Sequence, residues 1–469
     1  MRKRFSLLVL VLVFALVAAA CSSDDGGDTT TTAGGTEETT TTTSGGTDET
    51  TTTAGETPAE VMTDIGVDAE NKVIKLGLLA DLTGLFAATV TDITDATSVF
   101  WDQVNANGGL TDGWTVELVI EDTNYNVEQH MEKYAKLREE VVAITQSTGS
   151  PTSITMLPDA VTDDLVFTPL SWYSGWAIPE FDGGNALELN SNYCLEAMNL
   201  VSFMKDNGGQ TIALATFPSD YGFDAGAGVK AAAEYYGMEV VYDGDGAVIP
   251  GQDQTPVIQG IVGSGADWTF LTTNPSIGAE ILAGAVQAGY TGMFTGSVPT
   301  YDFRLLDSAA GPLYDAVYYQ SSWGNLWGES SPGYDNMLAA LQAAYPDRRP
   351  SDSFLLGWQE SLAWQAVLEA AIASGDLTRA GVKAAANSLE TVDFGGMAPN
   401  QSYAGTPNEF VTRETAVYDP DLATYTAAGG AEQTLSQAGS STGSLPMTGW
   451  FASDAAKDYD FTAPCYSLG

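Results

Sequence analysis

Histidine and cysteine are scarce in this chain, which has one histidine and three cysteines among 469 residues. The histidine, His130, lies in NVEQHMEKYAKL, a stretch with helical periodicity, and we interpret it as a surface or packing residue. Zinc sites draw mainly on several His and Cys ligands, and this sequence has one histidine and no cysteine cluster. We therefore expect no metal ion and no cofactor.

Basic residues are also few, with 17 Lys and Arg against 61 Asp and Glu and a formal net charge of −44. A surface of this sign repels nucleic-acid phosphates and anionic lipid headgroups. Nucleic acid is therefore excluded as a partner. A saline habitat is one explanation of the acidity, and the sequence leaves the reason open.

Catalytic motifs are lacking as well. The stretch GSSTG at 439–443 matches G-x-S-x-G, but it lies in a Gly/Ser/Thr-rich tail without the apolar strand that a nucleophile elbow follows. DGDGAVIPG at 243–251 lacks the lysine of a P-loop. We predict that the chain is not an enzyme, and a secreted hydrolase is kept as a remote alternative.

What the chain does have begins with an export signal. Three basic residues at 2–4 precede the apolar run FSLLVLVLVFALVAAA, which is short for a membrane span. The ending Ala18-Ala19-Ala20-Cys21 resembles a bacterial lipobox. This predicts a signal peptide at 1–20 and a lipidated Cys21, and the alternative is an ordinary signal peptide with an incidental cysteine.

The segment after Cys21 is of low complexity, with threonine tracts between AGGTEE, SGGTDE and AGETPAE. It offers almost no apolar surface to bury, so we predict a disordered tether over 21–71. A lipid anchor and a tether would hold a folded body at the outer face of the cell membrane, with no other membrane contact. The chain is expected to act there as a monomer.

Two cysteines remain in the exported part, Cys194 and Cys465. Exported proteins meet an oxidising compartment, where an even number of cysteines favours a disulfide. The alternative is a pair of buried free thiols.

From residue 72 onward short apolar runs alternate with stretches of helical periodicity, which predicts parallel sheets with crossover helices. The first set of predicted strands covers 73–80, 115–122, 141–145 and 165–169, and the second covers 211–217, 238–244, 268–274 and 293–297. Two successive α/β units of similar size indicate two lobes.

The segment GLLADLTGLFAATVTDITDATSVFWDQVNANGGL at 77–110 resembles the opening of type I periplasmic binding proteins, the leucine/isoleucine/valine-, amide- and urea-binding components of ABC importers. Three later segments agree with that family in order and spacing: TGSPTSITMLP (148–158), PSDYGFDAGAGVKAAAEYYGMEVV (218–241) and PGQDQTPVIQGIVGSGADWTFL (250–271). The resemblance implies two Rossmann-like lobes joined by three hinge crossovers. Lobe 1 would be 72–189 plus 317–391, and lobe 2 would be 190–316 plus 392–469.

The resemblance also implies a ligand cleft between the lobes. Gly149 and Ser150 begin a helix, whose free N–H groups suit a carboxylate or carbonyl oxygen. TPLSWYSGW at 168–176 leaves a predicted strand on the same side, and there we predict Trp176 to be packing. The full set of predicted ligand contacts is Phe86, Thr89, Gly149, Ser150, Leu170, Ser171, Trp172, Tyr193, Tyr221, Asn274, Tyr301 and Trp323.

One departure from the family limits the ligand. Its amino-acid binders pair the α-ammonium with two acids, and this sequence has Tyr193 and Val298 at those places, with Asp302 nearby if the loop shifts. An unpaired buried ammonium is costly, so an aromatic, amide or uncharged ligand is favoured over a zwitterion. The expected function is capture of a small amino-acid-like, amide or aromatic solute for an ABC permease. A ligand-sensing lipoprotein without a transport role is the alternative.

Overall fold

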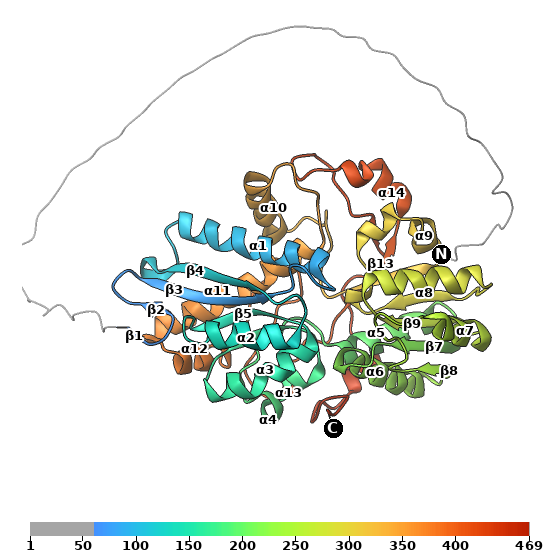
Figure 1. Cartoon of the computed structure of the whole chain (residues 1–469), viewed down its shortest axis with the longest axis horizontal. Helices are drawn as coiled ribbons and strands as arrows, with labels where there is room; N and C mark the ends of the chain where they lie inside the picture. The colour runs from blue at the N-terminus through green and yellow to red at the C-terminus, as the bar shows by residue number, and fades with distance from the viewer. Residues whose placement is uncertain (1–60, 469) are drawn as a thin grey trace, which may run out of the picture. The chain divides into compact units, whose positions relative to one another are not determined.

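The computed structural model describes residues 61–468 (Figure 1). The predicted signal peptide, Cys21 and most of the predicted tether lie outside these residues. The end of the predicted tether, 61–71, is a correction, because β1 (Met62–Thr63) pairs with β12 (Asp376–Leu377) and β2 (Val67–Asp68) pairs antiparallel with the next strand. These two pairings, together with the packing of Val67 against a hydrophobic core, make 61–71 part of the folded body.

The first sheet has five strands, four of them parallel, as the alternating pattern predicted. These four are β3 (Val73–Ala80), β4 (Thr115–Asp122), β5 (Ala143–Thr148) and β6 (Phe167–Leu170). The predicted strands 73–80 and 115–122 coincide with β3 and β4 to the residue. The apolar runs on which those predictions rest are buried in β3, with Leu76, Leu78 and Leu79 fully inaccessible.

Helices cover the first sheet and form the body of the first lobe (Figure 1). They are α1 (Ala87–Ala106), α2 (Val127–Leu137), α3 (Ser150–Thr162), α10 (Pro332–Ala344), α11 (Ser353–Ser374) and α12 (Arg379–Ala386). α11 buries Trp358 and Trp364 in the core of this lobe. A side chain at Gly357 would lie 2.2 Å from the Ile93 carbonyl oxygen, so glycine permits α11 to pack closely on α1.

The second sheet has seven strands and forms the core of the second lobe. They are β7 (Thr211–Thr216), β8 (Glu239–Gly244), β9 (Trp268–Thr272), β10 (Met293–Gly296), β11 (Tyr318–Ser322), β13 (Ala416–Pro420) and β14 (Ser444–Pro446). β7 to β11 are parallel, whereas β13 and β14 add an antiparallel edge. The main helices of this lobe are α5 (Tyr193–Asp206), α6 (Asp220–Tyr236), α7 (Thr255–Ser264), α8 (Pro275–Gln287) and α9 (Gly311–Val317).

The chain passes between the two lobes three times, but two passes come later than predicted. β11 pairs with β10, so the segment from 317 still belongs to the second sheet. Residues 392–403 pack in the first core through Val392, Phe394 and Tyr403, although 392 was predicted to begin the return to lobe 2. Strand pairing and core contacts decide where a lobe ends. Resemblance to a family does not specify these contacts, so both boundaries were predicted too early.

The three passes lie side by side at the hinge. Asn325 N–H donates to the Met397 carbonyl (2.7 Å), the Asn190 N–H donates to Gln401, and Ser191 forms a bridge with Thr412. Short helices complete the chain: α4 (Pro179–Asp182), α13 (Pro407–Phe410), α14 (Leu422–Ala427) and α15 (Asp454–Asp458). Within residues 61–468, every helix is too short or too polar to cross a membrane.

A disulfide fixes the end of the chain to the second lobe. Cys194, buried in α5, is bonded to Cys465, with a Cα–Cα distance of 6.3 Å. Nearby, Cys465 N–H donates to Ser174 Oγ (2.8 Å) and Tyr173 Oη donates to the Tyr466 carbonyl (2.7 Å). The C-terminal tail therefore also touches the loop 171–177 of the first lobe.

Candidate functional site

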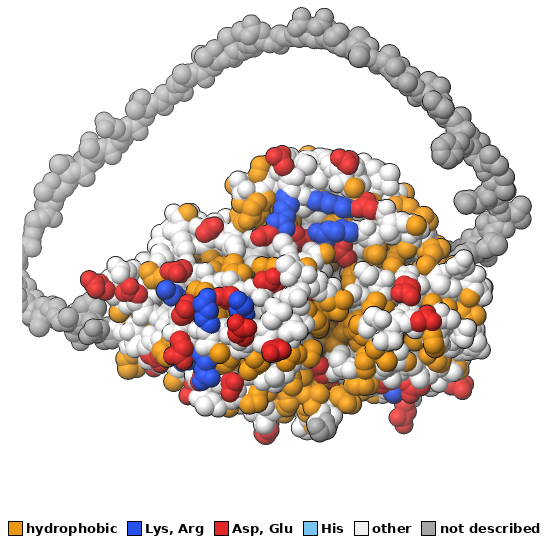
Figure 2. Space-filling model, viewed as in Figure 1, with side chains coloured by type: hydrophobic (Ala, Val, Ile, Leu, Met, Phe, Trp, Pro, Cys, Tyr) orange, Lys and Arg blue, Asp and Glu red, His pale blue; other side chains and the backbone are white. Residues whose placement is uncertain are grey.

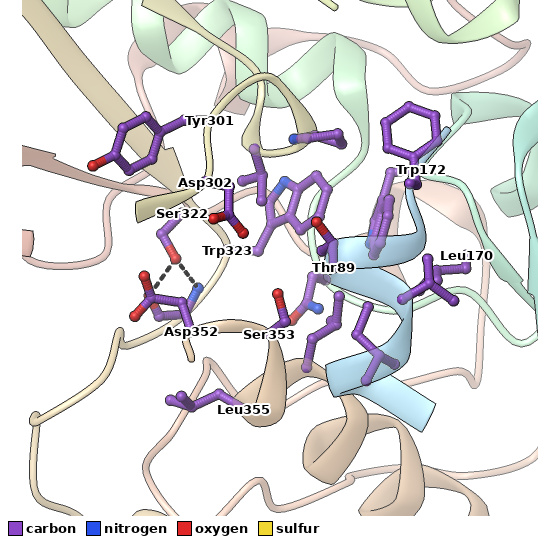
Figure 3. Close-up of a pocket in the computed structure, with 18 of the residues that line it drawn as sticks. Thr89, Leu170, Trp172, Tyr301, Asp302, Ser322, Trp323, Asp352, Ser353 and Leu355 are labelled. Atoms are coloured by element: carbon purple, nitrogen blue, oxygen red, sulfur yellow. Dashed lines mark hydrogen bonds between the residues drawn. The ribbon is translucent and has the colours of Figure 1, made fainter. Parts of the chain in front are cut away.

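A cavity lies where the carboxyl ends of parallel strands from both sheets meet (Figure 3). Its walls come from the ends of β5 and β6 in the first sheet and from the segments after β10 and β11 in the second. The empty volume of the cavity, including its opening, is about 1110 Å³. Open α/β sheets bind ligands at this edge of the strands.

Aromatic rings form much of the cavity wall. Trp172 and Trp323 stack with ring centres 4.0 Å apart and planes at 28°. Tyr193 lies behind this pair and packs on Tyr221, with ring centres 4.6 Å apart. One lobe contributes Trp172 and the other contributes Tyr193 and Tyr221, so a planar or apolar solute would touch both lobes at once.

The beginning of α3 forms another part of the wall. Gly149 has φ = 99°, and a Cβ there would lie 2.5 Å from the Tyr125 ring, so the position requires glycine for both reasons. The Tyr125 ring packs on Phe86 with ring centres 5.0 Å apart. Ser150 Oγ is hydrogen-bonded to Ser171 Oγ, which turns the Ser150 hydroxyl toward the loop behind the cavity.

Two carboxyl groups line the cavity, and the lining described by the structure contains no lysine, arginine or histidine. Asp302 is paired, because both of its oxygens accept from Arg304, at 2.8 Å from the backbone N–H and 2.9 Å from the guanidinium. Asp352 accepts at Oδ1 from the Trp327 N–H (2.8 Å) and Thr442 Oγ1 (2.9 Å). Burial raises the pKa of Asp352 to about 7, which makes its charge dependent on its surroundings.

A buried acid holds the segment that carries Asp302. Glu196 of α5 accepts from the Val298 N–H through Oε1 (2.9 Å). Burial raises the pKa of Glu196 to about 8. As the sequence analysis expected, the Val298 side chain cannot pair with an ammonium. The Val298 backbone N–H is bound to Glu196, and this acid does not line the cavity.

An ion-pair network adjoins the cavity. Asp92 of α1, whose side chain is 3% exposed, binds Arg304 from the second lobe and Arg348 from the segment after α10. Asp95 binds Arg348 as well. Figure 2 shows basic side chains gathered on this face, with apolar side chains along its middle. The arginines nearest the cavity are thus engaged by acids rather than exposed to a ligand.

The cavity brings together ten of the twelve predicted ligand contacts: Phe86, Thr89, Gly149, Ser150, Leu170, Trp172, Tyr193, Tyr221, Tyr301 and Trp323. Ser171 and Asn274 do not line it. Ser171 is buried behind the wall, where it also accepts from Trp176 Nε1 (3.3 Å). Asn274 caps α8 by accepting from the Ile277 N–H (2.9 Å). Both follow strands, and their side chains serve the local backbone and packing instead.

Sequence reasoning missed Tyr125 and Asp352. Tyr125 follows the predicted strand 115–122, so its position beyond a strand end was the available signal. Asp352 stands immediately before α11, far along the chain from the other contacts, and its only local signal was an acid ahead of an apolar helix. Its proximity to Asp302 depends on the hinge crossover, which local patterns do not specify.

The residues that were considered for a metal site or a hydrolase do not line the cavity. His130 is fully buried in the first lobe with Nε2 3.2 Å from Ser147 Oγ, and burial lowers its pKa to about 4. GSSTG at 439–443 runs into the edge strand β14, and its Thr442 binds Asp352. This loop lacks the strand-to-helix turn of a nucleophile elbow.

The chain is similar to known binding proteins. Residues 73–443 match the family model described as periplasmic binding protein. A fatty acid ABC transporter substrate-binding protein from Thermomonospora curvata has 25% identity and a TM-score of 0.75, with 87% of this chain and 98% of that chain covered. No curated protein matches the sequence.

Two structures with bound amino acids share the fold at lower identity. A branched-chain amino acid ABC transporter protein from Thermus thermophilus with bound valine has 14% identity and a TM-score of 0.68, covering 84% of this chain and 99% of that one. A branched-chain amino acid substrate-binding protein from Streptococcus pneumoniae with isoleucine has 16% identity and a TM-score of 0.61, covering 75% and 97%. The predicted two-lobed α/β fold is thereby confirmed.

Proposed function

The chain belongs to the periplasmic binding protein family, and from that premise we propose that it captures a small solute outside the cytoplasm and delivers it to the permease of an ABC importer. The observation that carries this proposal is a cavity to which both lobes contribute aromatic walls, with Trp172 from one and Tyr193 and Trp323 from the other. A solute between the lobes would favour the closed arrangement that a permease recognises.

The solute is proposed to have an apolar or aromatic body with hydrogen-bonding ends. The stacked indoles and the tyrosines favour such a body, and Asn190 and Gln359 supply polar groups in the same lining. The similar structures include a fatty acid ABC transporter substrate-binding protein and two proteins that hold valine or isoleucine, so amino-acid-like, amide, aromatic and fatty-acid solutes form the set to be tested.

The anchoring at Cys21 is part of the same proposal. The basic start, the apolar run and Ala18-Ala19-Ala20-Cys21 support lipidation, which would keep the receptor at the outer face of the cell membrane. Mass spectrometry of the protein purified from its membrane should find a diacylglyceryl mass on the N-terminal cysteine. A mature N-terminus without lipid would contradict the anchor and leave solute binding untouched.

A thermal-shift screen of the purified protein tests solute capture. Amino acids, amides, urea, aromatic acids and short fatty acids are the panel, and a ligand at 100 times its Kd should stabilise the protein by about 2.7 kcal/mol. Closure should also change the fluorescence of Trp172 and Trp323. A screen in which no compound raises the melting temperature would contradict the proposed function.

The alternative, a sensing lipoprotein without transport, shares this cavity and differs in its partner. Uptake of the identified solute, measured in cells with and without the gene, separates the two. Loss of uptake on deletion supports the importer, whereas unchanged uptake supports the sensor.

A further inference from the structure

Asp352 is distinguished from the other charged groups around the cavity. Among residues 61–468, none forms an ion pair with it, whereas Asp302 is paired with Arg304 and Asp92 with two arginines. Asp352 is half-buried and lines the cavity. Figure 3 shows Asp352 and Asp302 among the residues that line the cavity. The cavity thus holds one carboxyl group whose charge the described residues leave uncompensated.

The position of Asp352 is fixed by its neighbours. Its Oδ1 atom accepts from the Trp327 N–H and from Thr442 Oγ1, and α11 begins directly after it with the fully buried Phe354. No hydrogen bond within the described part of the chain reaches Oδ2. A carboxyl group held at one oxygen, with the other free, is oriented to accept a hydrogen bond from a molecule in the cavity.

The charged residues of the lining favour a positive group at this place. Asp302 and Asp352 are its two charged residues, and the described lining includes no basic side chain that could bind an anion. A carboxylate entering the cavity would face Asp352 without a basic lining residue to offset the repulsion. An ammonium would meet a charge-assisted hydrogen bond.

We propose that Asp352 binds an amino group of the solute, so that the receptor selects amines with an apolar or aromatic body over carboxylic acids of the same shape. This inference rests on the proposed function as a solute receptor and names its substrate class. It also revises the expectation from Tyr193 and Val298. The carboxylate that those positions lack is supplied by Asp352, from a different segment of the chain.

Isothermal titration with three compounds that share a phenylethyl body tests the proposal: 2-phenylethylamine, 3-phenylpropanamide and 3-phenylpropanoate. The expected order places the amine at least tenfold tighter than the acid. Asp352→Asn keeps an acceptor for Trp327 and Thr442 but removes the charge. It should weaken the amine about tenfold or more and change the amide by less than threefold.

The matched control is Asp347→Asn, which removes one charge from an exposed residue five positions away and should leave all three affinities unchanged. If Asp352→Asn fails to fold, Asp352→Glu, which retains the charge, should keep the preference for amine over acid. A wild-type preference for the acid overturns the proposal, as does an Asp352→Asn protein that binds the amine like wild type.

Failure of the inference is distinguishable from failure of the proposed function. If the three compounds do not bind but the thermal-shift screen finds a ligand without an amino group, the substrate class is wrong and the receptor function stands. If neither the three compounds nor the screen gives a ligand, the receptor function fails, and the inference with it.

Discussion

Arg304 and Asp92 form an ion pair between the two lobes, beside the cavity. Asp92 is on α1, which packs against α11 in the first lobe, and Arg304 follows β10 in the second lobe and also binds Asp302 in the cavity wall. The second oxygen of Asp92 accepts from Arg348 at 2.6 Å. The buried Asp92 carboxylate therefore links the first lobe to Arg304 of the second lobe, and through Arg304 to Asp302 in the cavity wall.

Asp92→Asn should lower both stability and ligand affinity. The asparagine can accept from only one of the two arginines, and the other would keep only its second acid, which is Asp302 for Arg304 and Asp95 for Arg348. Because the arginine side chains are 30% and 29% exposed, we expect a modest loss of about 1–3 kcal/mol in the free energy of unfolding, measured by urea denaturation. Affinity should fall about three- to tenfold, because the closed arrangement loses an interlobe contact.

Glu117→Gln is the matched control for Asp92. Glu117 pairs with Lys75 at 3.6 Å on the surface, with both side chains at least 40% exposed. Exposed pairs contribute little, so its loss should change stability by less than about 0.5 kcal/mol and leave affinity unchanged. Equal effects of the two substitutions would show that the Asp92 pair does not join the lobes energetically.

Trp172→Ala should weaken ligand binding by about 1–3 kcal/mol, because the indole forms cavity wall and stacks on Trp323. Titration calorimetry with a ligand from the thermal-shift screen measures the change. Trp176→Phe is the control. Trp176 is 2% exposed, packs edge-on against Phe167 and does not line this cavity, so its change should lower the melting temperature without altering affinity. Unchanged affinity in Trp172→Ala would make the loop structural.

The contrast between Trp172 and Trp176 illustrates how much of the fold and of the site the sequence predicted. Alternating apolar runs predicted β3 to β10, because burial and periodicity are local properties. The position after a strand then placed Trp172 at the cavity, and the expectation that Trp176 is packing agrees with its burial against Phe167 and its place outside the cavity lining.

The features that the sequence did not predict depend on contacts between segments that are distant in the chain. β14 joins the second sheet at its antiparallel edge, and no crossover helix precedes it that would announce it. Asp352 lines the cavity because the chain crosses back to the first lobe at the hinge, just before α11 begins. Ser171 and Asn274 follow strands as ligand contacts do, but a neighbouring hydroxyl and a helix end take up their hydrogen bonds. Such competition is decided by three-dimensional neighbours.

Reduction of the Cys194–Cys465 disulfide should destabilise the second lobe. The two cysteines are 271 positions apart, and their bond restricts the unfolded chain over that length. We expect a loss of about 2–4 kcal/mol, visible as a lower melting temperature with dithiothreitol and reproduced by the double variant Cys194→Ser, Cys465→Ser. Addition of dithiothreitol to the double variant is the control and should have no further effect. A melting temperature that reduction leaves unchanged would contradict the prediction.

Stability should fall as the pH rises from about 5 to 8. Burial raises the pKa of Asp224 to about 7 and those of Glu188 and Glu196 to about 8, from ordinary values near 4. In this window the folded protein retains protons that the unfolded chain has already released, so each increase in pH favours unfolding. His130 acts in the opposite sense, because its lowered pKa of about 4 costs stability as the pH falls below about 6.5.

Glu196→Gln isolates one of these carboxyl groups. The glutamine keeps an acceptor for the Val298 N–H and does not titrate, so the variant should gain about 1–3 kcal/mol relative to wild type between pH 5 and pH 8. Urea denaturation at four pH values measures the difference. The control is Glu139→Gln, at an exposed position, and its free energy of unfolding should change with pH in the same way as that of wild type. A Glu196→Gln profile that also ran parallel would mean that Glu196 is ionised in the folded protein throughout this range, with its charge stabilised by the Val298 N–H.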